Sequence, residues 1–208
     1  MALAVSFLTG VTQHTSMNEV AALMDKEPKQ TLAHAPWKNY PYHPQVQFSI
    51  AHCENAVLLQ YTVQEKAVRA LHNAPNSPVY EDSCVEFFIA FDKEAAYYNF
   101  EFNCIGTCQA GYGEKRHSRQ LLPEENIRRI QYLSQFSNGR WVLSLSIPFS
   151  CFFQHHLSTL RGKTARGNFY KCGDALPDPH FLSWSNIHWP EPNFHLPTFF
   201  DVIDFRTA

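Results

Sequence analysis

Polar side chains alternate with apolar ones in two nearby segments whose composition is that of β-strands. Glu86 lies between Val85 and an aromatic residue, and Asn99, Glu101 and Asn103 follow the same alternation a few residues later. Because successive side chains of a strand point to opposite faces, these four polar residues should share one surface. Carboxylates and carboxamides among aromatic rings suit a polyhydroxylated ligand, whose hydroxyls need donors and acceptors and whose C–H faces stack on rings.

The two carboxylates have three alternative roles. Glu86 and Glu101 could be the catalytic pair of a glycosidase, one as an acid with a raised pKa and one as nucleophile or base. They could instead accept hydrogen bonds from a sugar or from Arg166. A third interpretation is an ion pair with Arg116 or Arg166, which would offset the cost of burying the carboxylates. The sequence leaves these alternatives open.

Further candidates lie in the last quarter of the chain. Arg166, Asn168 and Tyr170 alternate onto one face of a predicted strand, where the guanidinium and the carboxamide point together. Ligand contact and an internal salt bridge are both open for Arg166. Trp184 and Trp189 lie in a proline-rich segment, where they could form a stacking platform or cover the end of a core.

No metal or cofactor site is predicted. The six cysteines include no C-x-x-C pair, and the eleven histidines show no spacing typical of metal ligands. We interpret Cys84 and Cys104 as small buried hydrophobic residues. No G-x-S-x-G nucleophile motif occurs. The six cysteines are Cys53, Cys84, Cys104, Cys108, Cys151 and Cys172.

Composition excludes several classes of protein. The chain has 208 residues, of which 45% are hydrophobic and 14% aromatic, enough for one sizeable core. A formal net charge of −2 gives no basic stripe for a nucleic-acid backbone. No apolar run reaches the roughly 20 residues of a membrane span, and the start lacks the basic residues of a signal peptide. The sequence as given predicts a cytoplasmic protein, or a periplasmic or extracellular one if a leader has been removed.

The N-terminal part predicts a helix followed by an irregular arm. Ser16 and Glu19 have the spacing of a capping box, so a short helix should begin there. Residues 27–44 contain four prolines, each without a backbone donor, and should form an arm that Trp37 and Tyr40 attach to the body. We therefore expect residues 1–44 to pack as a helix and arm on a domain of residues 45–208.

The pattern of the rest of the chain predicts strands separated by turns. Asn138-Gly139 is typical of a type I′ hairpin, which needs positive φ at both central residues. The predicted fold class is all-β, a two-sheet antiparallel β-sandwich of jelly-roll or immunoglobulin-like type. Period-two alternation predicts that its core includes Val85, Phe87, Ile89, Phe100, Phe102, Trp141, Leu143 and Leu145. Strands are expected at residues 46–50, 56–63, 83–91, 97–105, 107–112, 127–136, 141–147, 165–171 and 198–205.

Four long motifs lie within residues 46–205. They are Asp82-Ser83-Cys84-Val85-Glu86-Phe87-Phe88-Ile89, Tyr98-Asn99-Phe100-Glu101-Phe102-Asn103-Cys104-Ile105-Gly106, Arg166-Gly167-Asn168-Phe169-Tyr170-Lys171-Cys172-Gly173-Asp174 and His180-Phe181-Leu182-Ser183-Trp184. The first resembles a strand of family-nine carbohydrate-binding modules and of the wider DOMON-like β-sandwiches. The other three are similar to family-nine-like proteins of polysaccharide-degrading bacteria.

The resemblance implies a non-catalytic protein that binds a mono- or oligosaccharide between aromatic rings at one end of the sandwich. Tyr80 stands where the best-understood members have a tryptophan platform, and Trp184 or Trp189 falls where a second platform is expected. The implied site consists of Tyr80, Glu86, Asn103, Arg166, Asn168 and Trp184. The alternatives are a protein-interaction or structural domain with a vestigial sugar site, and a small glycosidase using Glu86 and Glu101. No oligomeric state is predicted.

Overall fold

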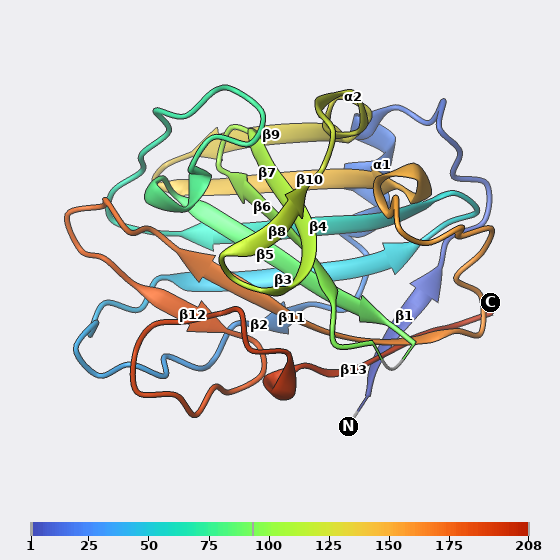
Figure 1. Ribbon diagram of the computed structural model, residues 1–208. Coiled ribbons are helices and arrows are strands. Elements are labelled where there is room, and N and C mark those ends of the chain that lie inside the picture. Colours follow the sequence, from blue (N-terminus) through green and yellow to red (C-terminus); the bar gives the residue numbers. More distant parts are fainter. Residues whose placement is uncertain (1, 93, 208) are drawn as a thin grey trace.

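The computed structural model describes residues 2–92 and 94–207 and is mostly β, with 41% of residues in strands and 10% in helices (Figure 1). This confirms the all-β class. The helices are α1 (Met17–Met24) and α2 (Glu124–Ile127), together with three short 3₁₀ turns, η1 (Val79–Glu81), η2 (Phe149–Cys151) and η3 (Pro197–Phe199). Within the described residues, no helix combines the length and apolar character that crossing a bilayer would require.

Within the described residues, thirteen strands account for the rest of the regular structure. They are β1 (Leu3–Phe7), β2 (Gln30–Thr31), β3 (Gln45–His52), β4 (Ala56–Gln64), β5 (Cys84–Phe91), β6 (Tyr97–Asn103), β7 (Cys108–Lys115), β8 (Ser118–Leu121), β9 (Gln131–Ser137), β10 (Arg140–Pro148), β11 (Thr164–Cys172), β12 (Phe181–Ser183) and β13 (Asp201–Phe205).

The strands form one curled mixed sheet, not two separate antiparallel sheets. Its main path runs β8-β7-β6-β5-β11-β13-β1-β3-β4-β10-β9, with β12 beside β11 and β2 beside β3. All neighbours pair antiparallel except β1, which is parallel to both β13 and β3. The two-sheet prediction fails because β1, from a segment assigned no strand, supplies the hydrogen bonds that join the two halves. The jelly-roll or immunoglobulin-like type stays a prediction.

The sheet curls around a core built from the predicted alternation. All eight core residues named from the sequence are buried. Phe48 on β3 stacks on Phe169 on β11, with ring centroids 3.9 Å apart, and Phe169 stacks in turn on Phe87 of β5. Because β3 and β11 belong to opposite halves of the sheet, these rings fix the two halves face to face.

A second apolar cluster covers the outer face of β5, β6 and β11. Phe88, Tyr97 and Tyr170 project there and pack against Trp37 of the arm and Phe194 of the segment after β12. Every residue of β5 and β6 is consequently buried. The polar residues of these strands therefore lie beneath other chain segments, where only a cleft can give a ligand access to them.

Local sequence signals place several turns and caps correctly. The Ser16 hydroxyl accepts from the Glu19 amide while the Glu19 carboxylate accepts from the Ser16 amide, which confirms the capping box. Asn138 and Gly139 have φ of 49° and 76°, as the predicted hairpin requires. The strand expected to start at residue 127 was wrong, because residues 124–127 form α2 and β9 begins only at residue 131.

Candidate binding cleft

A cleft of about 470 Å³ opens on the outer face of the sheet, above β5, β6 and β11. Its size lies within the range typical of small-molecule pockets. The sheet supplies the floor, the β7–β8 hairpin one wall, and the arm and the segment after β12 the other walls. The lining residues are Tyr40, Tyr80, Glu86, Asn99, Glu101, Gln109, Arg116, His117, Arg119, Cys172, Asp174, Phe181, Pro192, Asn193, Phe194 and His195.

Two carboxyl groups lie side by side on the floor. Glu86 on β5 and Glu101 on β6 are direct cross-strand partners, so their side chains project from the same face. The Asn99 amide donates to Glu101 Oε1 over 2.8 Å, and Arg119 Nε donates to Asn99 Oδ1 over 2.7 Å. Arg119 thus orients Glu101 through Asn99.

Arg119 is itself held by the backbone around it. Its guanidinium donates to the carbonyls of Tyr97 and Gly113 over 2.6 and 3.0 Å, and lies 4.3 Å from the centre of the Tyr97 ring. These contacts tie the β7–β8 hairpin to β6. The wall of the cleft and the floor are therefore fixed relative to each other.

Burial and mutual repulsion keep protons on the floor of the cleft. Burial raises the pKa of Glu101 to about 7, and it raises the pKa of Glu86 well above the usual range of glutamate, with the neighbouring Glu101 adding to the rise. Near neutral pH the floor therefore offers both a carboxyl donor and carboxylate acceptors to a ligand.

Aromatic rings line the opposite side of the cleft. Tyr40, Tyr80 and Phe181 are only partly buried, and Tyr40 packs edge-to-face on Phe181 with centroids 4.8 Å apart. Phe194 stacks on Tyr170 with centroids 4.2 Å apart, which fixes the wall on the sheet. Exposed ring faces beside buried carboxyl groups suit a ligand with both C–H faces and hydroxyls.

Chain segments distant in sequence form these walls. Trp37 Nε1 donates to the Trp189 carbonyl over 2.8 Å, so the arm is anchored to the segment after β12. The Tyr97 hydroxyl and His195 Nδ1 are 2.9 Å apart, which fixes the same segment to β6. Apart from β2 and a backbone bridge between His34 and Ser183, the described parts of these proline-rich segments form no strand ladder, and side-chain hydrogen bonds help to position them.

The structure brings two of the six predicted site residues into the cleft. Tyr80 and Glu86 line it. Asn103 does not, because its amide donates to the His72 carbonyl and to Asp82 Oδ2 at the end of β6. Asn168 is fully buried and exchanges hydrogen bonds with the Ser185 backbone.

The predicted second platform and the predicted arginine also lie elsewhere. Trp184 packs edge-on against Phe48 and Phe169. Arg166 donates to the carbonyls of Pro197 and Glu94, so within the described residues it does not form the ion pair with Glu86 or Glu101 that was one of its open alternatives. The competing candidate, Trp189, is half exposed but does not line the cleft. The six residues therefore do not converge at one site.

Sequence reasoning missed much of the cleft wall. Tyr40 was predicted only as an anchor, and Arg119, Asp174 and His195 were not singled out as site residues. Their positions depend on the long-range folding of the arm, of the β7–β8 hairpin and of the segment after β12. The alternation that places Glu101 on the floor was the one local signal, and it pointed to the correct strand face.

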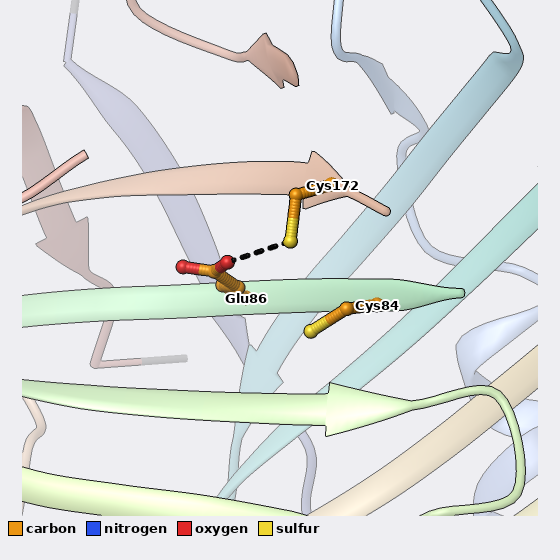
Figure 2. A group of neighbouring side chains, drawn as sticks. All are labelled: Cys84, Glu86 and Cys172. Carbon is orange, nitrogen blue, oxygen red and sulfur yellow. Dashed lines mark hydrogen bonds between the residues drawn. The ribbon is translucent and has the colours of Figure 1, made fainter. Parts of the chain in front are cut away.

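Two groups of side chains in the described residues have a spacing that could hold a metal ion. Cys84, Glu86 and Cys172 are buried side by side (Figure 2), and two of them, Glu86 and Cys172, also line the cleft. The second group, Asp92, Glu94 and His155, lies at the surface at the end of β5. Sequence spacing predicted neither group.

Comparison with known proteins gives the family. Residues 18–205 match the family described as carbohydrate-binding family 9. The chain is 39% identical to a candidate carbohydrate-binding protein from Bacteroides uniformis, with 98% of each chain covered and a TM-score of 0.92. No curated protein matches the chain.

Two more distant structures share the fold. They are a family 9 carbohydrate-binding module from Caldicellulosiruptor kristjanssonii in complex with cellotriose and in complex with glucose. Each is 12% identical to this chain and covers all of it, with 95% and 97% of the module covered and TM-scores of 0.66 and 0.62. The wider DOMON-like relationship stays a prediction. The match over residues 18–205 shows that the chain belongs to carbohydrate-binding family 9.

Proposed function

We propose that this protein binds a mono- or oligosaccharide in the cleft above β5, β6 and β11, without catalysing a reaction on it. One observation carries the proposal: the cleft combines the paired carboxyls of Glu86 and Glu101 with partly exposed rings. The carboxyls would accept and donate hydrogen bonds to sugar hydroxyls, and the rings would stack on the C–H faces of the sugar.

The proposed contacts follow from the geometry of the cleft. Tyr80 and Phe181 provide the stacking surfaces, while Glu86 and Glu101 form hydrogen bonds with the sugar hydroxyls from the floor of the cleft. Arg116 is exposed at the wall and would reach the outer hydroxyls of the same sugar. Family membership supports this proposal, as do the cellotriose and glucose complexes of the structurally similar module.

Family membership favours binding over hydrolysis. Glycosidases use a pair of carboxyl groups at the bond that they cleave, so Glu86 and Glu101, which project side by side from adjacent strands, are the residues that test the alternative. Purified protein should therefore release no product from aryl glycosides. Turnover that is lost in both Glu86→Gln and Glu101→Gln would instead support the glycosidase.

Calorimetry with cellotriose, glucose and a panel of other oligosaccharides tests the binding. Stacking and a few charge-assisted hydrogen bonds predict a Kd between about 1 μM and 1 mM, or roughly 4–8 kcal/mol. Tyr80→Ala should weaken the affinity by about tenfold, because one stacking surface is lost. Trp189→Ala removes a half-exposed ring outside the cleft and should leave the affinity unchanged.

The opposite result would identify the alternative. If no saccharide on a broad glycan array binds the folded protein, the cleft is vestigial and the protein is an interaction or structural domain. If saccharide binding survives Tyr80→Ala but is lost in Trp189→Ala, the site lies elsewhere on the surface and the cleft is not the binding site.

A further inference from the structure

Strand register brings two cysteines and a glutamate together under the cleft. Cys84 and Glu86 are two residues apart on β5 and therefore project from the same face. Cys172 lies on the neighbouring strand β11 and is the cross-strand partner of Cys84, so it lies beside Cys84 and Glu86 (Figure 2). The Cys172 sulfur is 3.1 Å from Glu86 Oε1, and the two sulfurs and a Glu86 carboxylate oxygen all lie within 4.8 Å of one another.

These three side chains are almost completely shielded from solvent. Their exposed fractions are 0% for Cys84, 3% for Glu86 and 1% for Cys172. In the described part of the chain, the Cys172 thiol is the hydrogen-bond partner of the Glu86 carboxylate, and no salt bridge joins Glu86 to a cation. A bound metal ion would supply the positive charge that an ionised Glu86 carboxylate needs in this buried place.

We propose that Cys84, Glu86 and Cys172 bind a zinc ion, with a fourth coordination position open toward the cleft. Two thiolates and a carboxylate are ligands that Zn²⁺ accepts, at about 2.3 Å for sulfur and 2.0–2.2 Å for oxygen. Tetrahedral geometry with these bond lengths separates the donor atoms by about 3.5–3.8 Å. The observed cluster meets this with small side-chain movements, without a change of strand register.

The open position follows from the placement of the ligands. Glu86 and Cys172 line the cleft, whereas Cys84 does not. An ion held by all three would present its remaining position to the cleft, where water or another oxygen ligand can reach it. Three protein ligands with one open position distinguish this site from the closed four-ligand sites of structural zinc.

Positively charged residues near the proposed site would compensate for its net charge. Binding of Zn²⁺ releases the two thiol protons, and any proton held by Glu86, to solvent. The ion with two thiolates and one carboxylate has one net negative charge. Arg116 and Arg119 line the same cleft and would compensate for it. The inference depends on strand geometry and does not require that the cleft bind a sugar.

Titration of the reduced, metal-free protein with Co²⁺ tests the site. Cobalt replaces zinc in such sites, and thiolate ligation gives a charge-transfer absorption in the near ultraviolet. We expect this band to saturate at one Co²⁺ per chain and to disappear when Zn²⁺ is added. Cys84→Ser and Cys172→Ser should each abolish the band, and Glu86→Gln should weaken the affinity by at least about tenfold.

A matched control and a direct measurement make the outcome decisive. Cys104→Ser alters a buried cysteine outside the cluster and should retain the band. If the Cys84 and Cys172 variants do not fold, X-ray absorption at the zinc edge of the wild-type protein counts the sulfur ligands directly, and two are expected. Absence of the cobalt band in wild-type protein, or a zinc ion without sulfur ligands, would overturn the proposal. Saccharide calorimetry tests the proposed function and not the zinc site, so a failure of sugar binding would leave the outcome of the cobalt titration unaffected.

Discussion

The buried carboxylate of Asp82 holds a loop near the cleft in place. It accepts from the backbone amides of Leu71 and His72 and from the Asn103 amide, and Arg69 Nε lies 3.3 Å from it. Burial opposes its charge, but these hydrogen bonds outweigh burial and lower the pKa of Asp82. Asp82 therefore ties residues 69–72 to β6 just behind Tyr80.

Asp82→Ala should destabilise the protein by about 2–4 kcal/mol, because several buried donors would lose their acceptor. Urea unfolding monitored by circular dichroism measures the change. Asp178→Ala is the matched control: Asp178 is exposed and forms only a 3.8 Å surface ion pair with Lys66, so its loss should change stability by less than about 0.5 kcal/mol. Equal effects of the two substitutions would contradict the structural role of Asp82.

His195 gives a pH dependence at the edge of the cleft. Burial, with Arg119 adding to it, lowers the pKa of His195 to about 3 from its usual 6.5. The folded state thus binds fewer protons than the unfolded state between these two values, so stability falls as the pH decreases through this window. His180, whose pKa burial lowers to about 4, acts in the same direction.

The His195 contribution can be separated by substitution. The free energy of unfolding, measured by urea at about pH 7.5 and about pH 5, should fall more on acidification for wild type than for His195→Gln. The variant retains a polar group opposite the Tyr97 hydroxyl but has no titrating ring. A wild-type protein that becomes more stable on acidification relative to this variant would show that His195 is not buried in its neutral form.

At the residue scale, the sequence predicts side-chain direction better than side-chain neighbours. Period-two alternation places Glu86 and Glu101 on the outer face correctly. The same alternation cannot predict that Asn103 donates a hydrogen bond to Asp82. That contact depends on where residues 69–72 cross the end of β6. Arg166 shows the same limit: its partners are backbone carbonyls of loops, which leave no pattern in the sequence.

The elements around the cleft differ in how they are held. The floor is a hydrogen-bonded sheet, whereas the arm and the segment after β12 depend on side chains such as Trp37 and Phe194, which pack with centroids 5.8 Å apart. Local stability should therefore be lower in these walls than in the strands. The predicted boundary between residues 1–44 and 45–208 stays a prediction.

Trp37→Ala tests whether the arm shapes the cleft. Trp37 is 5% exposed, so its truncation should cost about 3–5 kcal/mol if the arm stays folded, and less if it simply detaches. In either case Tyr40 loses its position, and saccharide affinity measured by calorimetry should fall. Hydrogen exchange should increase in residues 36–40 and 189–195 while β5 and β6 remain protected. Unchanged affinity would mean that the arm is not part of the binding wall.

Elements with strong local signals were predicted, and those formed by tertiary pairing were not. The helix α1 has a capping box, and the β9–β10 hairpin has Asn138-Gly139. β1 has neither a turn signal nor a long alternating pattern, and it is a strand because β13 and β3 flank it. The parallel pairings, and with them the continuous sheet, could not be predicted from local sequence.

The whole molecule should unfold as one cooperative unit, since the rings of Phe48 and Phe169 join the two halves of the sheet. Phe169→Ala should cost about 3–5 kcal/mol. Phe136→Ala, at a phenylalanine that is 54% exposed, should change stability by less than about 0.5 kcal/mol. Circular dichroism and tryptophan fluorescence should report coincident transitions in urea. Two separated transitions would show that the halves of the sheet are stable independently.

The pairing of β1 with β13 sets the order in which the chain can fold. Leu3 pairs with Ile203, so one edge of β1 is covered by a strand that the ribosome makes much later. β1 can pair with β3 early, but its pairing with β13, and with it the closure of the sheet, must wait until β13 has been made. Contacts of such long sequence separation slow folding. Until β13 has been made, the nascent chain should expose an unpaired edge of β1, an edge of the kind to which other chains can pair.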